Sequence, residues 1–170
     1  PLGPGEVGEL WLQTASAMTG YWQDPQATDV TIVDGWLRSG DLARVDERGC
    51  YHLAGRVGEM YIRGGYNVHP QEVEGVLSMH QGVKQIAIIP REDPVMGEIG
   101  VAVVVPADPE KPPTLRELTK IGRTDLATYK IPEDLIVVDA LPLNTAHKVD
   151  RRRLTDLVRE HPADGSDLMK

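Results

Sequence analysis

Apolar residues in the first third of the chain form short runs between turn residues. Residues 9–13 are one such run, and residues 42–45 and 50–53 are two more, separated by Asp46-Glu47-Arg48-Gly49. This pattern predicts short strands, the last two joined as a hairpin in which the glycine takes a positive φ. Asp24-Pro25 predicts a turn. No helical apolar period of useful length occurs before about residue 70, so this segment is predicted to be β-rich.

From about residue 60 onward, predicted strands alternate with predicted helices. Apolar, β-branched runs predict strands over residues 60–63, 85–89, 101–105 and 134–139. Helix starts are predicted at Pro70 in the first helical position, at the Thr114/Glu117 capping box and at Asp150 as an N-cap. A boundary near residues 55–60 therefore separates an all-β segment, too short to bury a core alone, from an α+β domain of about 100 residues.

Composition narrows the functional classes. Lys plus Arg number 18 and Asp plus Glu number 26, so the net charge is −8 and no nucleic-acid partner is expected. No stretch approaches the ~20 apolar residues of a membrane span, and no signal peptide is visible. The single cysteine, Cys50, cannot form an intramolecular disulfide, so a reducing, cytoplasmic location is expected. The five histidines lack metal-ligand spacing, so no metal site is predicted. Because the first residue is Pro1 and not Met, we expect the chain to begin inside a longer natural one.

Two segments of the first part carry candidate binding chemistry. In Ser39-Gly40-Asp41 the small pair lets a ligand approach the backbone, and the carboxylate can accept hydrogen bonds from two neighbouring hydroxyls, as on a ribose. Arg56 could hold a hydroxyl or a phosphate oxygen. Taken singly, a turn aspartate and a surface arginine explain these residues equally well.

Two segments of the second part are also candidates. Gly64-Gly65 lies between a predicted strand and the helix that starts at Pro70, where bare backbone could face a ligand or form a tight turn only. Lys148 lies on a loop just before the last predicted helix, and its ammonium group suits phosphate or carboxylate oxygens. The alternative for Lys148 is the solvated basic start of a helix.

In their order, these segments resemble the adenylate-forming superfamily, which includes acyl-CoA synthetases, the adenylation domains of peptide synthetases and firefly luciferase. The resemblance runs from Gly5 to Arg153 and takes in Gly20-Tyr21-Trp22 and Asp34-Gly35-Trp36. It implies an α+β fold in which residues 57–161 form the small mobile C-terminal domain, with helices on a three-stranded sheet. Residues 1–56 would be the incomplete, β-rich end of the large N-terminal domain, and residues 162–170 a tail.

The resemblance also implies a chemistry. Such enzymes activate a carboxylic acid with ATP and Mg²⁺ to an acyl-adenylate, and acyl-CoA synthetases then rotate the small domain and transfer the acyl group to coenzyme A. Asp41 matches the residue that holds the ribose hydroxyls of ATP, and Arg56 matches a second nucleotide contact. Lys148 matches the lysine that reaches into the site during adenylation.

Other positions match parts that move between the two half-reactions. Glu59 falls at the hinge, and Gly64, Gly65 and Tyr66 match the loop that swings in for thioester formation. Glu72 and Glu74 match carboxylates that follow this loop, although a solvated first helical turn explains them equally well. Arg151, Arg152 and Arg153 could contact coenzyme A phosphates or cover a helix surface.

The chain departs from the family pattern at four positions. Ser39 stands where Thr is usual, Gly58 where Lys is frequent, Glu59 where Asp or Lys is usual, and His147 where Gly usually precedes the lysine. The histidine restricts the loop and adds a titrating group near Lys148.

The function expected from the resemblance is that of the C-terminal part of an AMP-forming acyl-CoA synthetase acting on a fatty or aryl acid, fatty being favoured. The phosphate loop and the acid pocket are not in this sequence, so the chain alone is expected to be inactive. The alternatives are a fatty acyl-AMP ligase, a peptide-synthetase adenylation domain, and a non-catalytic module that binds a nucleotide, coenzyme A or a protein.

Overall fold

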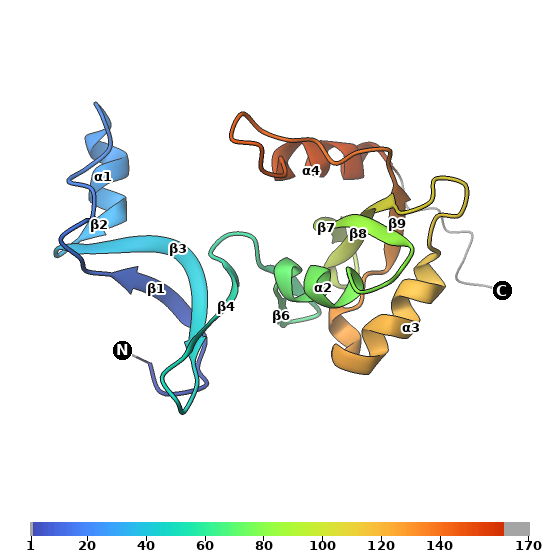
Figure 1. Ribbon diagram of the computed structural model, residues 1–170, viewed down its shortest axis with the longest axis horizontal. Helices are drawn as coiled ribbons and strands as arrows, with labels where there is room; N and C mark the ends of the chain where they lie inside the picture. The colour runs from blue at the N-terminus through green and yellow to red at the C-terminus, as the bar shows by residue number, and fades with distance from the viewer. Residues whose placement is uncertain (1, 162–170) are drawn as a thin grey trace. The chain divides into compact units, whose positions relative to one another are not determined.

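The computed structural model describes residues 2–161, and the chain divides into two compact units, Pro1–Glu59 and Met60–Lys170 (Figure 1). Each unit has its own sheet. The domain limits drawn between residues 56 and 57 stay a prediction, and the expected tail, residues 162–170, lies outside the described residues.

The first unit is a four-stranded antiparallel sheet built around one long strand. Its elements are β1 (Gly8–Leu12), α1 (Pro25–Thr31), β2 (Ile32–Val33), β3 (Trp36–Val45) and β4 (Tyr51–Arg56). β3 pairs with all three of the other strands. The predicted β3–β4 hairpin is confirmed: Gly49 has a φ of 79°, and Asp46 Oδ1 accepts hydrogen bonds from Arg48 N and Cys50 N at 2.9 Å each.

The sequence pattern, which showed no helical period of useful length before about residue 70, missed a short helix. Asp24-Pro25, predicted as a turn, begins the seven-residue helix α1, with Asp24 Oδ1 accepting from Ala27 N at 2.9 Å and Pro25 in the first turn. α1 buries no residue, so it has no apolar stripe for a sequence pattern to reveal.

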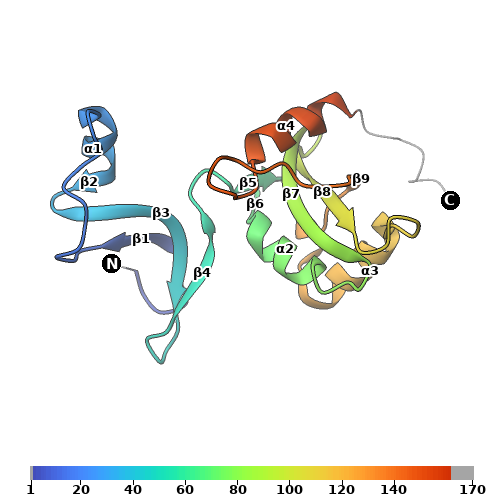
Figure 2. The same ribbon diagram turned by 45° about the horizontal axis from the view of Figure 1, so that its top comes forward.

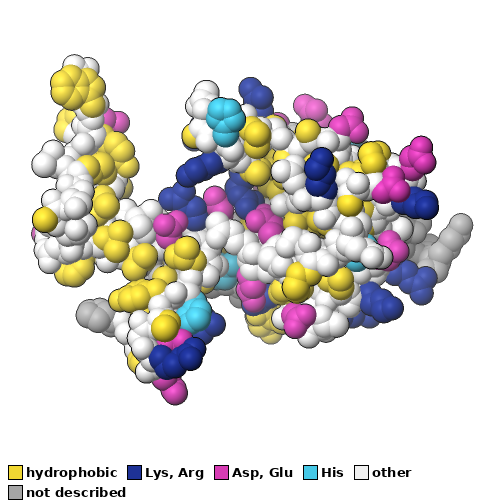
Figure 3. All heavy atoms as spheres, in the orientation of Figure 1, with side chains coloured by type: hydrophobic (Ala, Val, Ile, Leu, Met, Phe, Trp, Pro, Cys, Tyr) yellow, Lys and Arg dark blue, Asp and Glu magenta, His cyan; other side chains and the backbone are white. Residues whose placement is uncertain are grey.

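The first unit has almost no core, as the length of this segment predicted. Among its described residues, Ala43 is the only buried hydrophobic one. Trp22 is 89% exposed and Leu53 is 70% exposed, and Figure 3 shows hydrophobic side chains over much of this unit's surface.

The second unit places helices on both faces of a mixed sheet (Figure 2). Its elements are β5 (Tyr61–Arg63), β6 (Tyr66–Val68), α2 (Pro70–Leu77), β7 (Val83–Asp93), β8 (Gly97–Pro106), α3 (Leu115–Asp125), a 3₁₀ turn η1 (Thr128–Lys130), β9 (Asp134–Val137) and α4 (Arg151–Glu160). The strands run in the order β6-β5-β8-β7, and β9 pairs with β8 in parallel. The fold is α+β, as expected.

The expected count of three strands was wrong, because this sheet has five. β5 and β6 have three residues each, and both are strands because they pair with each other across a tight turn. β5 lies within the strand predicted over residues 60–63, but β6 was not predicted, because a segment this short carries no alternation of its own and is defined by its pairing partner.

Alternate residues of β8 enter two separate hydrophobic cores. Ala102 and Val104 pack with α2 and α3, in a cluster that includes Leu77 and Leu118. The other core joins β7, β8 and β9 to α4 and consists of Ala87, Ile89, Val101, Val103, Val105, Ile136, Leu141, Leu154 and Val158. This explains why the 101–105 run is apolar throughout: a strand covered on both faces has no polar side.

The predicted helix starts of this unit are confirmed. Pro70 begins α2, Thr114 and Glu117 form both bonds of a capping box, and Asp150 Oδ1 accepts from Arg153 N at 3.3 Å. None of the helices described within residues 2–161 has the length and apolarity to cross a bilayer.

Candidate functional site

Asp41 and Arg56, predicted to contact a nucleotide, are direct partners across β3 and β4. Arg56 Nε donates to Asp41 Oδ1 at 2.9 Å, and Arg56 Nη2 donates to the Ser39 carbonyl at 3.2 Å. The Arg56 side chain is 49% exposed and the Asp41 side chain is 38% exposed, so a ligand can reach both. The pair is therefore an exposed, hydrogen-bonded set of one acceptor and one cation.

The backbone at Gly40 explains why the motif has a glycine there. Gly40 has a φ of 73°, and a Cβ built on it would lie 3.4 Å from Arg56 Nη2. Ser39 Oγ accepts from Asp41 N at 3.0 Å. Threonine, the usual residue at this position in the family, has the same hydroxyl and could accept the same hydrogen bond. The change to serine therefore keeps this contact.

Glu59 is the last residue of the first unit, where the hinge was predicted. Its N–H donates to the Arg56 carbonyl at 3.2 Å, and Gly58 between them has a φ of 87°. A turn with a left-handed glycine thus connects the Asp41–Arg56 pair to the start of the second unit.

Gly64 and Gly65 form the two-residue turn that joins β5 to β6. Their φ values of 55° and 86° are those of a type I′ hairpin, which needs φ > 0 at both positions. Gly64 N donates to Met96 O at 2.8 Å, which fixes the turn against the β7–β8 connection. The two glycines therefore form a tight turn, and their role in a loop that swings in for thioester formation stays a prediction.

Tyr66, the third residue of the predicted thioester loop, stacks on Tyr129. The ring centroids are 4.6 Å apart with 21° between the planes, and Tyr66 is 59% exposed. Lys130 Nζ lies 5.8 Å from the centroid of the Tyr129 ring and pairs with Glu72 at 2.6 Å. Sequence reasoning missed Tyr129 and Lys130, because only the η1 turn brings them to α2 and β6.

Lys148 lies on a short closed loop ahead of α4. Asn144 N donates to Lys148 O at 2.8 Å, and Asn144 Oδ1 accepts from Ala146 N at 2.9 Å and from Lys148 N at 3.1 Å. A bridge between Leu143 and Val149 closes the base. Lys148 is exposed, and within residues 2–161 its ammonium group has no ion-pair partner. The loop therefore presents a free cation on an ordered backbone.

His147 explains what the family glycine does at this position. Its φ is 56°, in the left-handed region, and its N–H donates to Asn144 O at 3.0 Å. A glycine takes this conformation without strain, whereas a side chain costs about 1–2 kcal/mol. His147 therefore has the backbone conformation that glycine takes most easily, and it places an imidazole next to Lys148 in the sequence.

Glu72 and Glu74 have different surroundings although both lie on α2. Glu72 is at the surface and pairs with Lys130. The Glu74 side chain is only 19% exposed; it accepts from Ile88 N at 2.8 Å and pairs with Arg151 Nη2 at 2.7 Å. Glu74 therefore connects secondary-structure elements and is not a solvated first-turn residue.

His69, the residue that precedes α2, is half-buried next to the Glu72–Lys130 pair. Burial lowers the pKa of its imidazole; Glu72 opposes this shift, and Lys130 adds to it. Nδ1 is buried and has no hydrogen-bond partner within the described chain. The neutral imidazole is therefore the stable form at neutral pH.

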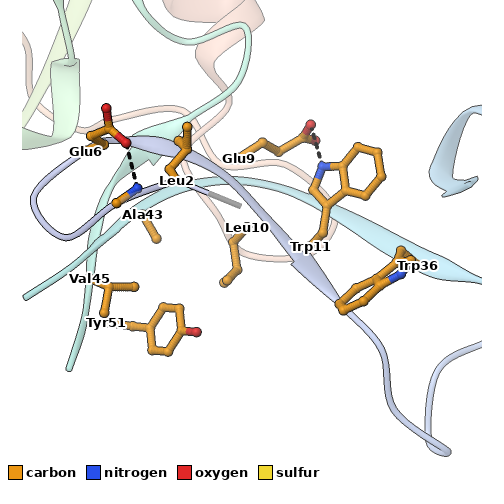
Figure 4. A pocket seen from close by; sticks show the side chains of 11 residues that line it. Leu2, Glu6, Glu9, Leu10, Trp11, Trp36, Ala43, Val45 and Tyr51 are labelled. Atoms are coloured by element: carbon orange, nitrogen blue, oxygen red, sulfur yellow. Dashed lines mark hydrogen bonds between the residues drawn. The ribbon is translucent and has the colours of Figure 1, made fainter. Parts of the chain in front are cut away.

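A separate hollow of about 700 Å³ lies on the first unit (Figure 4). It is mostly apolar, with Leu10, Trp11, Trp36 and Tyr51 among its lining side chains, and none of the predicted site residues lines it. At its edge the Glu9 carboxylate accepts from Trp11 Nε1 at 3.0 Å, a hydrogen bond that lowers the pKa of Glu9.

The residues 2–161 contain no group of three or more His, Cys, Asp or Glu side chains arranged to hold a metal ion.

The second unit is a small α+β domain with helices packed on both faces of its sheet. Residues 72–148 match the family "AMP-binding enzyme C-terminal domain". The second unit therefore carries the C-terminal domain of AMP-binding enzymes.

Relatives match both units of the chain. A feruloyl-CoA synthase of an Amycolatopsis species is 43% identical over 149 residues, 88% of this chain and 30% of that protein. A long-chain-fatty-acid–CoA ligase of Salmonella typhimurium is 38% identical over 93% of this chain and 28% of that protein. The chain thus spans about a third of the length of these curated relatives.

Solved structures agree with this assignment. The amide bond synthetase McbA of Marinactinospora thermotolerans superposes with a TM-score of 0.85 at 35% identity, covering 92% of this chain and 32% of that one. The o-succinylbenzoate CoA synthetase of Bacillus subtilis, solved with its acyl-adenylate intermediate, also has a TM-score of 0.85, at 34% identity, covering 91% of this chain and 31% of that one.

Proposed function

We propose that this chain is the C-terminal part of an AMP-forming acid–thiol ligase. The full-length protein would convert a carboxylic acid and ATP to an acyl-adenylate and pyrophosphate, then transfer the acyl group to coenzyme A. The observation that carries the proposal is that relatives named as a CoA synthase and a CoA ligase match 88–93% of the chain, across both units. A match to the C-terminal domain family alone would not reach the Asp41–Arg56 pair.

In this proposal Asp41 and Arg56 bind the nucleotide. The carboxylate accepts hydrogen bonds from the two ribose hydroxyls, since its two oxygens can accept several bonds while one of them stays paired with Arg56. The guanidinium holds the carboxylate in position and offers its remaining N–H groups to the nucleotide.

Lys148 acts in the adenylation step. An oxygen of the substrate carboxylate attacks the α-phosphorus of ATP, and pyrophosphate leaves with the electrons of the broken P–O bond. Negative charge gathers on the phosphoryl oxygens as this happens, and an ammonium group close by stabilises it. The ammonium group of the exposed Lys148 has no ion-pair partner within the described residues, so no ion pair must break before it acts.

The thioester step is assigned to a different set of residues, Glu59 and the turn that follows it. Rotation at Glu59 brings the Gly64-Gly65 turn to the acyl-adenylate, where its lack of side chains leaves room for the pantetheine arm. Tyr66 follows directly on this turn and is held by Tyr129.

The acid is proposed to be a fatty acid, with an aryl acid as the other choice. The relatives point both ways, since one is named for ferulate and another for long-chain fatty acids. The group that accepts the acyl chain is also not fixed by the relatives, because one structural neighbour is named as an amide bond synthetase and not as a CoA ligase. An acyl-AMP ligase that does not use coenzyme A is the corresponding second candidate.

The test is a pair of assays on the full-length enzyme and on this chain alone. Each is given ATP, Mg²⁺ and a panel of fatty and aryl acids, and pyrophosphate release is measured. The full-length enzyme is expected to release pyrophosphate with one class of acid and to form a thioester when coenzyme A is added. This chain is expected to release none, and robust release from it would contradict the proposal.

Lys148→Ala in the full-length enzyme separates the two half-reactions. Adenylation is expected to fall by about 10²–10³-fold, the usual effect of removing one charge-stabilising donor. Thioester formation from preformed acyl-adenylate is expected to change little. Equal loss of both steps would reject the role given to Lys148.

A further inference from the structure

The start of α4 is fixed to the sheet by a three-residue contact. Arg151 is the first residue of α4; its Nη1 donates to the Ile88 carbonyl at 3.0 Å and its Nη2 to Glu74 Oε1 at 2.7 Å. The same Glu74 oxygen accepts from Ile88 N at 2.8 Å. Arg151 and Glu74 thus enclose both backbone polar groups of Ile88, and we call this set the Glu74–Ile88–Arg151 clamp.

The clamp occupies an edge that the sheet leaves open. Within residues 2–161, β7 pairs only with β8, so the N–H and C=O groups on its outer side have no strand partner there. Unpaired backbone groups of this kind need other partners when water is excluded. Here a carboxylate and a guanidinium provide them, and charged partners make stronger hydrogen bonds than neutral ones.

The clamp lies at the foot of the Lys148 loop. Only Val149 and Asp150 separate Lys148 from Arg151, and Val149 is held by its bridge to Leu143. Asp150 N donates to the Pro142 carbonyl at 2.8 Å, and the preceding residue, Leu141, is buried in the core under α4. The position of Lys148 is thus set by this short connection to a helix start that α2 and β7 hold in place.

We infer that Arg151 is a positioning residue for Lys148, acting with Glu74 through the backbone of Ile88. The inference rests on the proposed adenylation role of Lys148 and adds residues that would support it. A displacement of about 1 Å at a reacting group can cost on the order of 10²-fold in rate. Loss of the clamp therefore affects the step that uses Lys148 and spares the step that does not.

The experiment uses the full-length enzyme and measures the two half-reactions separately. Arg151→Ala is expected to lower kcat for adenylation by about 10–100-fold, with the KM values for ATP and acid nearly unchanged. Transfer from preformed acyl-adenylate is expected to stay within about threefold. Arg152→Ala is the matched control, because Arg152 is the exposed neighbour in the same helical turn.

A double variant tests the link to Lys148 directly. If Arg151 works through Lys148, Lys148→Ala combined with Arg151→Ala adenylates no more slowly than Lys148→Ala alone, since residues that act as a unit are non-additive. Fully additive losses, or equal losses in both half-reactions, would overturn the inference.

Two milder variants keep the test decisive if Arg151→Ala does not fold. Arg151→Lys keeps the charge but lacks the fork that reaches two acceptors, and Glu74→Gln keeps a neutral acceptor for Ile88 N. Both are expected to fold, to lose part of the adenylation rate and to keep acyl transfer. Full adenylation in Arg151→Lys and Glu74→Gln, with loss in Lys148→Ala, would overturn the inference and leave the proposed function standing. Full adenylation in Lys148→Ala itself would instead overturn the proposed role of Lys148.

Discussion

Asp41 and Arg56 are cross-strand partners, and the same arginine that pairs with the carboxylate also bonds the carbonyl of Ser39. The guanidinium therefore ties together the two ends of the Ser39-Gly40-Asp41 segment. A side chain at Gly40 would press against it. One arginine thus determines both the shape of this segment and the orientation of its acidic group.

Asp41→Asn in the full-length enzyme is expected to raise the KM for ATP by about 10–100-fold. A hydrogen bond to a charged acceptor is worth about 1.5–3 kcal/mol, and the amide accepts with one oxygen only. Steady-state kinetics with varied ATP measure the effect. Asp46→Asn is the matched control, because Asp46 lies at the other end of the same hairpin. Equal KM changes in the two variants would argue against nucleotide binding at Asp41.

Gly65→Ala is expected to lower the free energy of unfolding by about 1–2 kcal/mol, since its φ of 86° is in the left-handed region. Gly75→Ala is the opposite case. Gly75 lies inside α2 with nothing within 4 Å of a built Cβ, so alanine is expected to stabilise by about 0.5–1 kcal/mol. Urea unfolding of both variants measures the change in the free energy of unfolding, which is expected to be a loss for Gly65→Ala and a gain for Gly75→Ala. A neutral Gly65→Ala would mean that the turn does not require φ > 0.

His147→Val is expected to destabilise the chain by about 1–2 kcal/mol, because a β-branched side chain is poorly tolerated at a φ of 56°. His147→Gly removes the strain of a side chain there and is expected not to destabilise. Urea unfolding again gives the difference, with Ala146→Val as the neighbouring control, expected within about 0.5 kcal/mol of the parent. A destabilising glycine together with a neutral valine would contradict the assigned backbone conformation.

Acid is expected to destabilise the second unit through His69. Burial lowers the pKa of this imidazole in the folded chain, so the unfolded chain takes up the proton more readily. Stability contributed by the neutral ring is complete above the unfolded pKa of about 6.5 and is lost as the pH falls toward the lower folded value. The groups that face it, Glu72 and Lys130, oppose and reinforce the shift respectively.

His69→Asn is therefore expected to flatten the decrease in unfolding free energy between about pH 7 and pH 5. Urea midpoints measured across this range test the effect. An unchanged slope in the variant would assign the acid sensitivity to other groups.

Local signals in the sequence predicted the features that local chemistry decides. Pro70, the Thr114/Glu117 box, Asp150 and the hairpin at Gly49 each act within a few residues, and each is confirmed. The apolar run of β8 was equally clear because both of its faces are covered.

Features that depend on distant partners could not be predicted in the same way. β6 exists because β5 lies opposite, and α1 has no buried stripe. Arg151 looked like one of three surface arginines, and only the fold brings it to Ile88 and Glu74. The Asp41–Arg56 pairing likewise depends on the β3–β4 register, which includes a bulge between Leu42 and Ala43.

The central strand β8 has a consequence for how the second unit opens. Val101, Val103 and Val105 belong to one core while Ala102 and Val104 belong to the other, so neither helical layer can detach without exposing residues next to those that hold the opposite layer. The amide protons of β8 are therefore expected to exchange with solvent only when the whole unit unfolds, as one cooperative foldon. If the second unit rotates as the proposed function requires, it is expected to turn as one rigid body, and the bending would fall on the residues before it.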